Sequence, residues 1–278
     1  MLNELLYAWP IIIAFMLTGL LAGILAGMLG IGGGIIIVPA MYFALQAFDV
    51  SSGSAIDIAI ATSLASLVPI SLVSTRSHYR RGNIDGNIVK WWASFIVVTS
   101  IIGSLVITSR HAYLLVVLYG LVATYACLNY LLGSKKPVSF QQLPNKPLQG
   151  VMASFVGILS VLSGLGGGAL AVPLLTHFNV PQHKAVGTAS VLGILISFPA
   201  VVLIVMFGQE PIDAAFGNVG LINMPALMVM VPLTILFAPV GVHLGASLDQ
   251  AKLKKAFAIT LLIIGVLMIY RGILTQPV

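Results

Sequence analysis

The chain has 278 residues, of which 59% are hydrophobic and 7% are charged, and its mean hydropathy is +1.09. An ordinary soluble domain is about a quarter charged, so this composition excludes a soluble fold and indicates a protein with several membrane spans. The formal net charge of +6 does not call for a nucleic-acid partner, because basic loops are the usual signal of membrane orientation.

The first apolar stretch is interrupted by glycine. Residues 5–48 contain no Asp, Glu, Lys or Arg, yet they include MLGIGGGIIIVP at 28–39. Glycine and proline disfavour helix, and a bilayer offers no water to satisfy a broken backbone. We therefore predict a pair of helical segments, about 8–29 and 35–48, on either side of a break. Pro39 is expected in the first turn of the second segment, where no N–H is needed.

Three ordinary spans follow, near residues 56–75, 89–109 and 112–132. The next stretch, GSKKPVSFQQLPNKP, is polar, basic and contains proline, which is typical of a linker. We expect a first membrane repeat at 1–133, a cytoplasmic linker at 134–147, and a second membrane repeat at 148–278, all within one integrated membrane domain.

The second half repeats the pattern of the first. GILAGMLGIGGGIIIVPAM at 23–41 aligns without gaps with GILSVLSGLGGGALAVPLL at 157–175, and nine of nineteen positions match, including five glycines and the proline. The segments AIATS and AVGTA are also similar, and their alignment pairs Thr62 with Thr188. The expected segments of this half are a pair at 149–163 and 169–179 and ordinary spans near 185–208, 221–245 and 254–274. Pro173 is expected in a first turn, like Pro39.

The charges predict orientation. If each glycine-broken pair returns to the side from which it started, 11 of the 13 Lys and Arg residues fall on one side, which is then cytoplasmic. Acidic residues are expected in loops, mostly on the other side: Glu4, Asp49, Asp57, Glu210 and Asp213. Each half then makes an odd number of effective crossings, so the two halves are inverted, as in many secondary transporters.

The predicted fold is an all-α polytopic membrane protein. It has two inverted repeats, each with a glycine-broken pair plus three spans, which gives eight to ten transmembrane elements. Charges do not decide whether the short segments 35–48 and 169–179 span or re-enter. Gly19, Gly23 and Gly27 have the small-xxx-small spacing of close helix packing.

The two glycine breaks are the candidate binding site. A helix that starts after a break presents free N–H groups and the positive end of its dipole, which favour an anion, and glycine allows close approach. Neutral hydroxyls near the breaks can add donors, although a threonine hydroxyl can equally bond to its own helix. The candidate residues are Gly32, Gly33, Gly34, Gly166, Gly167, Gly168, Thr62, Ser63, Thr188 and Ser163. No metal site is predicted, and His78 is expected at a loop.

The repeated GIGGG…VP and GLGGG…VP motifs, with HKAVGTAS at 183–190, resemble the sulfite exporter family of the TauE/SafE type. This resemblance covers nearly the whole chain. It implies a multi-pass permease of the bacterial inner (plasma) membrane for small sulfur-containing anions such as sulfite, sulfoacetate or related organosulfur compounds. It also implies that both glycine clusters line the central site, with Thr62 and Thr188 beside it. Ser63 aligns with Ala189, so the second repeat has no hydroxyl at this position.

The expected function is export of a small anion by alternating access, without a cofactor and without enzymatic activity. An anion channel with the same fold is one alternative. An intramembrane hydrolase using Ser163 and His243 is another, although Val161 stands where a nucleophile elbow requires glycine. The expected partners are the anion and the lipid bilayer. The identity of the anion, the direction of transport, a proton or other coupling ion, and homo-oligomeric assembly stay open.

Overall fold

The computed structural model describes residues 2–29, 33–108, 112–132, 142–214, 217–247 and 250–274. This part of the chain forms ten α-helices and one two-stranded antiparallel hairpin. The helices of the first half are α1 (Leu2–Leu29), α2 (Gly34–Gln46), α3 (Ser52–Arg80), α4 (Gly86–Thr108) and α5 (Ala112–Leu132). The second half comprises α6 (Lys146–Ser163), α7 (Gly168–His177), α8 (Gln182–Phe207), β1 (Asn218–Val219), β2 (Ile222–Asn223), α9 (Met224–Ser247) and α10 (Gln250–Leu274).

The predicted all-α polytopic fold is confirmed. Within the described residues, α3, α4, α6, α8 and α9 are long and apolar enough to cross a membrane, and the other five helices contain shorter apolar stretches of 10–17 residues. The second members of the two glycine-broken pairs are the shortest, with 13 residues in α2 and 10 in α7. At about 1.5 Å per residue they reach about 20 and 15 Å, less than the hydrocarbon core of about 30 Å. Neither can therefore cross the bilayer unaided.

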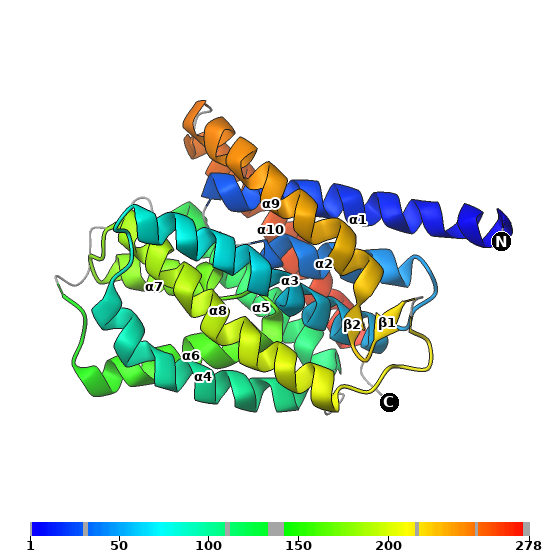
Figure 1. Ribbon diagram of the computed structural model, residues 1–278, viewed down its shortest axis with the longest axis horizontal. Coiled ribbons are helices and arrows are strands. Elements are labelled where there is room, and N and C mark those ends of the chain that lie inside the picture. The colour runs from blue at the N-terminus through cyan, green and yellow to red at the C-terminus, as the bar shows by residue number, and fades with distance from the viewer. Residues whose placement is uncertain are drawn as a thin grey trace.

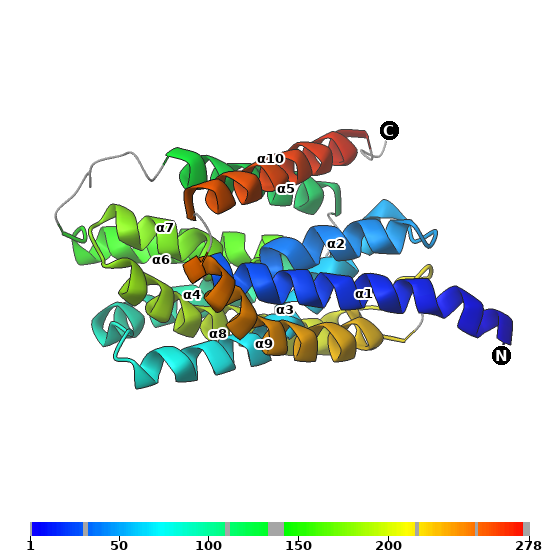
Figure 2. The same cartoon turned by 90° about the horizontal axis from the view of Figure 1, so that it is seen from above.

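Helices of the two halves pack against each other in matching pairs. Helix α1 lies along α9, just as α6 lies along α4, while α3 packs on α8 and α5 packs on α10. Figure 2 shows α5 and α10 side by side along one edge of the molecule. The pairs α3–α8 and α5–α10 join corresponding helices of the two halves. The pairs α1–α9 and α4–α6 correspond to each other. The two halves therefore share one core.

Close helix packing explains Gly19 and Gly23 of α1, whereas Gly27, which was also expected to pack, lines the cavity described below. Gly19 and Gly23 both lie against the backbone of α9, and a methyl group on Gly23 would be 2.7 Å from the Thr234 carbonyl oxygen. In the other pair, a methyl group on Gly157, the alignment partner of Gly23, would be 3.1 Å from the Ile96 carbonyl oxygen of α4. The packing prediction is thus confirmed for Gly19 and Gly23, and the same contact recurs in the second half.

The segments that carry the basic clusters gather at one end of the molecule. In Figure 1 the end of α3 and the starts of α4, α6, α8 and α10 lie at the left, whereas the start of α1, the end of α10 and both strands lie at the right. The left end is therefore the one that the positive-inside rule predicts to be cytoplasmic.

The two repeated prolines lie deeper in their helices than predicted. Pro39 and Pro173 are each the sixth residue of α2 and α7, so the first-turn placement was wrong. The reason is that the preceding glycine backbone is already helical: Gly33 has φ −73° and ψ −17°. Pro39 cannot donate to the carbonyl of Ile35, four residues earlier. The buried Tyr119 of α5 donates its hydroxyl to that carbonyl instead, at 2.6 Å.

Replacing Tyr119 by phenylalanine is expected to lower the free energy of unfolding by about 1–3 kcal/mol, because it leaves the buried Ile35 carbonyl without a donor. Thermal unfolding of the detergent-purified protein measures this. Tyr79→Phe is the matched control, since the Tyr79 side chain is 75% exposed. Equal unfolding temperatures for the two variants would contradict the assignment.

Asp57 does not lie in a loop as predicted. It is buried inside α3, with 5% of its surface exposed. The predicted span near 56–75 already contained position 57, so the loop placement disagreed with that span, and α3 begins even earlier, at Ser52. Ser51 caps this start, since its hydroxyl accepts the N–H of Ser54 at 3.4 Å. The span thus contains a buried carboxyl group that was expected in a loop.

Candidate functional site

The second glycine break is a tight left-handed turn between α6 and α7. Helix α6 ends at Ser163, and Gly164 and Gly166 follow with φ +64° and +65°. These values are accessible mainly to glycine, which explains two of the repeated glycines. The N–H groups of Gly164 and Leu165 bond back to carbonyls of the last turn of α6. The end of α6 is therefore closed by the turn itself.

The start of α7 is open. Its N-cap is Gly167, which makes no side-chain capping bond, and the Gly167 carbonyl accepts the N–H of Ala171 at 2.8 Å. The N–H groups of Gly168, Ala169 and Leu170 have no acceptor within the helix. They point out of the helix start together with the positive end of the helix dipole, which is an arrangement that attracts an anion.

The first break packs directly against the second. A methyl group on Gly34 would lie 2.5 Å from the Gly164 carbonyl oxygen and 3.0 Å from the Leu165 Cα. The same Gly164 carbonyl accepts the buried hydroxyl of Ser63 at 2.7 Å. The structure thus brings the two breaks together, as predicted, through Gly34. Gly32 lies outside the described residues.

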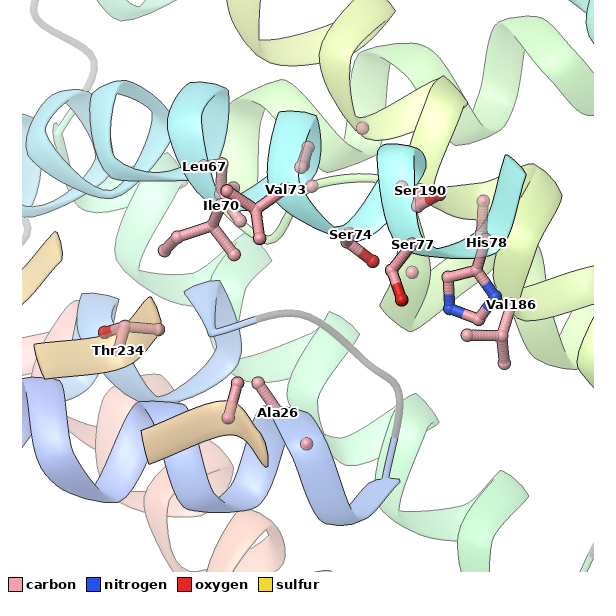
Figure 3. A pocket seen from close by; sticks show the side chains of 18 of the residues that line it. Ala26, Leu67, Ile70, Val73, Ser74, Ser77, His78, Val186, Ser190 and Thr234 are labelled. Carbon is pink, nitrogen blue, oxygen red and sulfur yellow. The ribbon is translucent and has the colours of Figure 1, made fainter. Parts of the chain in front are cut away.

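A cavity of about 520 Å³ opens beside the second break. Its inner wall is the backbone of Gly166, Gly167 and Gly168, and its other walls come from α1, α3, α8 and α9. Figure 3 shows the α3 side chains on one side and Ala26 and Thr234 on the other. The polar side chains among its lining are Ser71, Ser74, Ser77, His78, Arg81, Ser190 and Thr234.

One face of α3 forms a polar track along this cavity. Ser71, Ser74 and Ser77 follow one another at intervals of three residues, His78 is adjacent to Ser77, and Arg81 lies four residues after Ser77 at the exposed end. This track was missed by sequence reasoning, which selected hydroxyls in the first half of α3 and expected His78 at a loop. The three-residue serine spacing next to a basic helix end was the signal that could have revealed it.

The predicted threonines are buried away from the cavity lining. The Thr62 hydroxyl accepts the N–H of Asn223 at 2.9 Å, and the Thr188 hydroxyl accepts the N–H of Asp85 at 3.0 Å. Asp85 and Asn223 directly precede α4 and α9, and each accepts N–H groups from the first turn of its helix. Each threonine therefore anchors the start of a corresponding helix in the other half, and their role in binding stays a prediction.

The two predicted serines also lie behind the lining. Both are fully buried, with Ser63 bonded to the Gly164 carbonyl and Ser163 donating to the Leu159 carbonyl of its own helix. Of the predicted set, the cavity lining includes Gly166, Gly167 and Gly168, whereas Gly33 and Gly34 lie behind it. No group of three or more His, Cys, Asp or Glu side chains that could hold a metal occurs in the described part of the chain.

Comparison with known proteins adds independent evidence. The profile of the family described as sulfite exporter TauE/SafE matches residues 15–268. A probable membrane transporter protein of Haemophilus influenzae is 28% identical over 258 residues, which cover 92% of this chain and 97% of the relative. Probable membrane transporter proteins of Bacillus subtilis and Methanocaldococcus jannaschii are 25% and 23% identical, over 92% and 96% of this chain and 96% and 97% of their own lengths.

No solved structure matches the chain significantly. The family match covers most of the sequence and agrees with the apolar, multi-helical fold. The chain is therefore a multi-pass integral membrane protein that belongs to the sulfite exporter TauE/SafE family of transporters.

Proposed function

We propose that the protein exports small sulfur-containing anions, such as sulfite, sulfoacetate or a related organosulfur anion, by alternating access. The observation that carries this proposal is the cavity that runs from the uncapped start of α7 to Arg81. Backbone N–H groups and serine hydroxyls bind anion oxygens without a fixed charge at the site. A neutral site of this kind holds an anion and still releases it.

The cavity reaches one end of the molecule, which supports an inward-open state. Its lining includes 67–81 at the end of α3 and 186–193 at the start of α8, both at the end that the charges make cytoplasmic. These segments also place Arg81 at the mouth, where a guanidinium attracts anions from the cytoplasm. The binding groups of the second break lie at the far end of the cavity.

The opposite end is held by a contact between the halves. Asp213, in the loop after α8, accepts the N–H of Ser51 at 2.8 Å and the hydroxyl of Ser54 at 2.5 Å. These hydrogen bonds lower the pKa of Asp213 to about 2. Because the pKa is depressed, the contact is fully present above an unfolded value of about 3.9 and is lost as the pH falls through about 2. At neutral pH it keeps the loop on the start of α3.

The arrangement of the halves supports two inverted copies. In Figure 1, α3 runs from right to left and α8, its counterpart, runs from left to right. The glycine contacts of α1 with α9 recur between α6 and α4. In transporters with inverted repeats, exchange of the two conformations between copies moves the site from one face to the other.

The buried position of Ser163 gives the hydrolase alternative no support. Its hydroxyl is fully buried and donates to the Leu159 carbonyl, and Ser163 does not belong to the cavity lining. A nucleophile needs a base within hydrogen-bond reach and access to substrate.

The test is transport by purified protein in proteoliposomes. We expect saturable sulfite or sulfoacetate flux that is accelerated by the same anion on the opposite side. Detergent-purified protein is screened in parallel for binding of sulfite, sulfoacetate, sulfate, taurine and phosphate. If none of these compounds binds, the proposal of an anion transporter is wrong; single-channel current steps in a planar bilayer would establish a channel instead.

A further inference from the structure

We propose that Ser100 and Ser160 line a second anion cavity, closed in this structure, that opens to the outer face when the transporter changes state. This inference rests on the proposed alternating access of two related halves. It assigns a binding role to two side chains that lie outside the cavity already described.

Ser100 of α4 and Ser160 of α6 are unusual buried hydroxyls. Both side chains are fully buried, and neither hydroxyl oxygen has a hydrogen-bond partner among the residues that the structure describes. Their neighbours in α4 behave differently, since the hydroxyls of Thr99 and Ser104 donate to carbonyls of their own helix. Burying a hydroxyl without a partner is unfavourable, so these two positions need an explanation beyond packing.

In the sequence repeat, Ser160 aligns with a residue that lines the open cavity. GILA at 23–26 aligns with GILS at 157–160, so Ser160 corresponds to Ala26. Ala26 lines the open cavity from α1. Ser160 therefore occupies the position on α6 that would line the equivalent cavity.

The helix contacts place Ser100 in the same way. Gly241 of α9 packs against the Ile24 carbonyl of α1, and a methyl group on Gly103 of α4 would be 3.5 Å from the Ile158 carbonyl of α6. Ile24 and Ile158 are alignment partners, so Gly241 corresponds to Gly103.

Ala238 lies three residues before Gly241, and Ser100 lies three residues before Gly103. Ala238 also lines the open cavity. Both unpartnered serines thus correspond to small residues of the wall of the open cavity, although they lie on different helices.

The correspondence explains why the hydroxyls are unpartnered. In the present state α4 and α6 pack tightly and the serines have no acceptor or ligand. When the equivalent cavity opens, the same hydroxyls can donate to an anion or to water. Their burial without partners then disfavours the inward-open state slightly and favours the return to the outward-open state.

Cysteine accessibility tests this placement. The native Cys127 is buried and is first replaced by alanine. Ser100→Cys and Ser160→Cys are then treated, one at a time, with a charged, membrane-impermeant thiol reagent on right-side-out and inside-out vesicles. Ala26→Cys and Ala238→Cys are the matched controls. We expect the serine positions to react from the outer face and the alanine positions to react from the inner face. Serine positions that react from the inner face, or from neither, would overturn the proposal.

A second measurement separates a binding role from a structural one. The double variant Ser100→Ala with Ser160→Ala is expected to unfold at the same temperature as the wild type or higher, because it removes unpartnered hydroxyls. Its transport rate is expected to fall by at least about tenfold, because losing even one of its two hydrogen bonds to a charged group has that effect. A lower unfolding temperature with unchanged transport would show that the serines are structural.

The two proposals fail in different ways. If wild-type protein moves no sulfur-containing anion but the two pairs of positions react from opposite faces, the second cavity stands and the substrate assignment is wrong. If wild-type protein exports sulfite and the serine positions do not react from the outer face, the second cavity is wrong and the proposed export stands.

Discussion

Replacing Gly34 by alanine is expected to abolish transport and to lower the free energy of unfolding by about 3 kcal/mol. The added methyl group would lie 2.5 Å from the Gly164 carbonyl oxygen and 3.0 Å from the Leu165 Cα. Both are backbone atoms, and the Gly164 carbonyl is also held by Ser63. The two breaks would have to separate, which displaces the start of α7. Thermal unfolding in detergent and sulfite flux in proteoliposomes measure the two effects.

Two other glycines provide controls for this variant. A methyl group on Gly33 would first meet the flexible end of the Ile37 side chain at 3.3 Å, and one on Gly86 would have no atom within 4 Å. Gly33→Ala and Gly86→Ala are therefore expected to unfold like the wild type. If Gly34→Ala unfolds at the same temperature as these controls and transports normally, the two breaks do not meet as described.

Arg81→Gln is expected to raise the KM for anion taken up from the cytoplasmic face by about tenfold, since one nearby charge contributes on the order of 1–2 kcal/mol. Arg81 lies at the exposed end of the serine track on α3. The effect should shrink at about 1 M salt, where the Debye length is about 3 Å. Initial rates of flux at several substrate and salt concentrations measure it.

Arg80→Gln is the matched control, because Arg80 has the same charge at an adjacent exposed position outside the cavity lining. It is expected to leave KM within the error of the wild type. An equal rise in KM for both variants, or a rise for Arg81→Gln that salt does not reduce, would show that Arg81 has no specific place at the mouth.

The helical architecture could be predicted because composition sets it directly. Long runs without Asp, Glu, Lys or Arg marked every span, and the duplicated glycine–proline segment marked the two breaks. The observed helices occupy most of these segments, although residues 221–223 of the span predicted near 221–245 belong to the hairpin and α9 begins at Met224. The alignment of Thr62 with Thr188 in the sequence repeat was also informative, because the two side chains anchor the starts of corresponding helices.

Local boundaries were harder, because they depend on backbone details. Pro39 marks a helix start only if the glycines before it are not helical, and Gly33 already is. Asp57 was placed in a loop because a carboxylate disfavours a span, but the Ser51 cap starts α3 before it. Hydropathy decided neither start: α2 begins at a glycine whose backbone is helical, and α3 begins at the Ser51 cap.

The cavity could be predicted only in part. Gly166–Gly168 stood out because their spacing is repeated, and they form its inner wall. Ser71, Ser74 and Arg81 did not, because the face of α3 that meets the cavity is set by its packing on α8 and α9. Such packing joins residues more than a hundred positions apart, so the serine spacing marks a polar face of α3 but does not show what that face meets.

A crystal structure with selenite, the selenium analogue of sulfite, tests the central claim most directly, because anomalous scattering locates the selenium atom. The account predicts a single selenium peak about 3–4 Å from the backbone nitrogens of Gly168 and Ala169, as expected for an oxyanion bonded to the start of α7. A selenium peak elsewhere in the protein, with the start of α7 unoccupied, would contradict it.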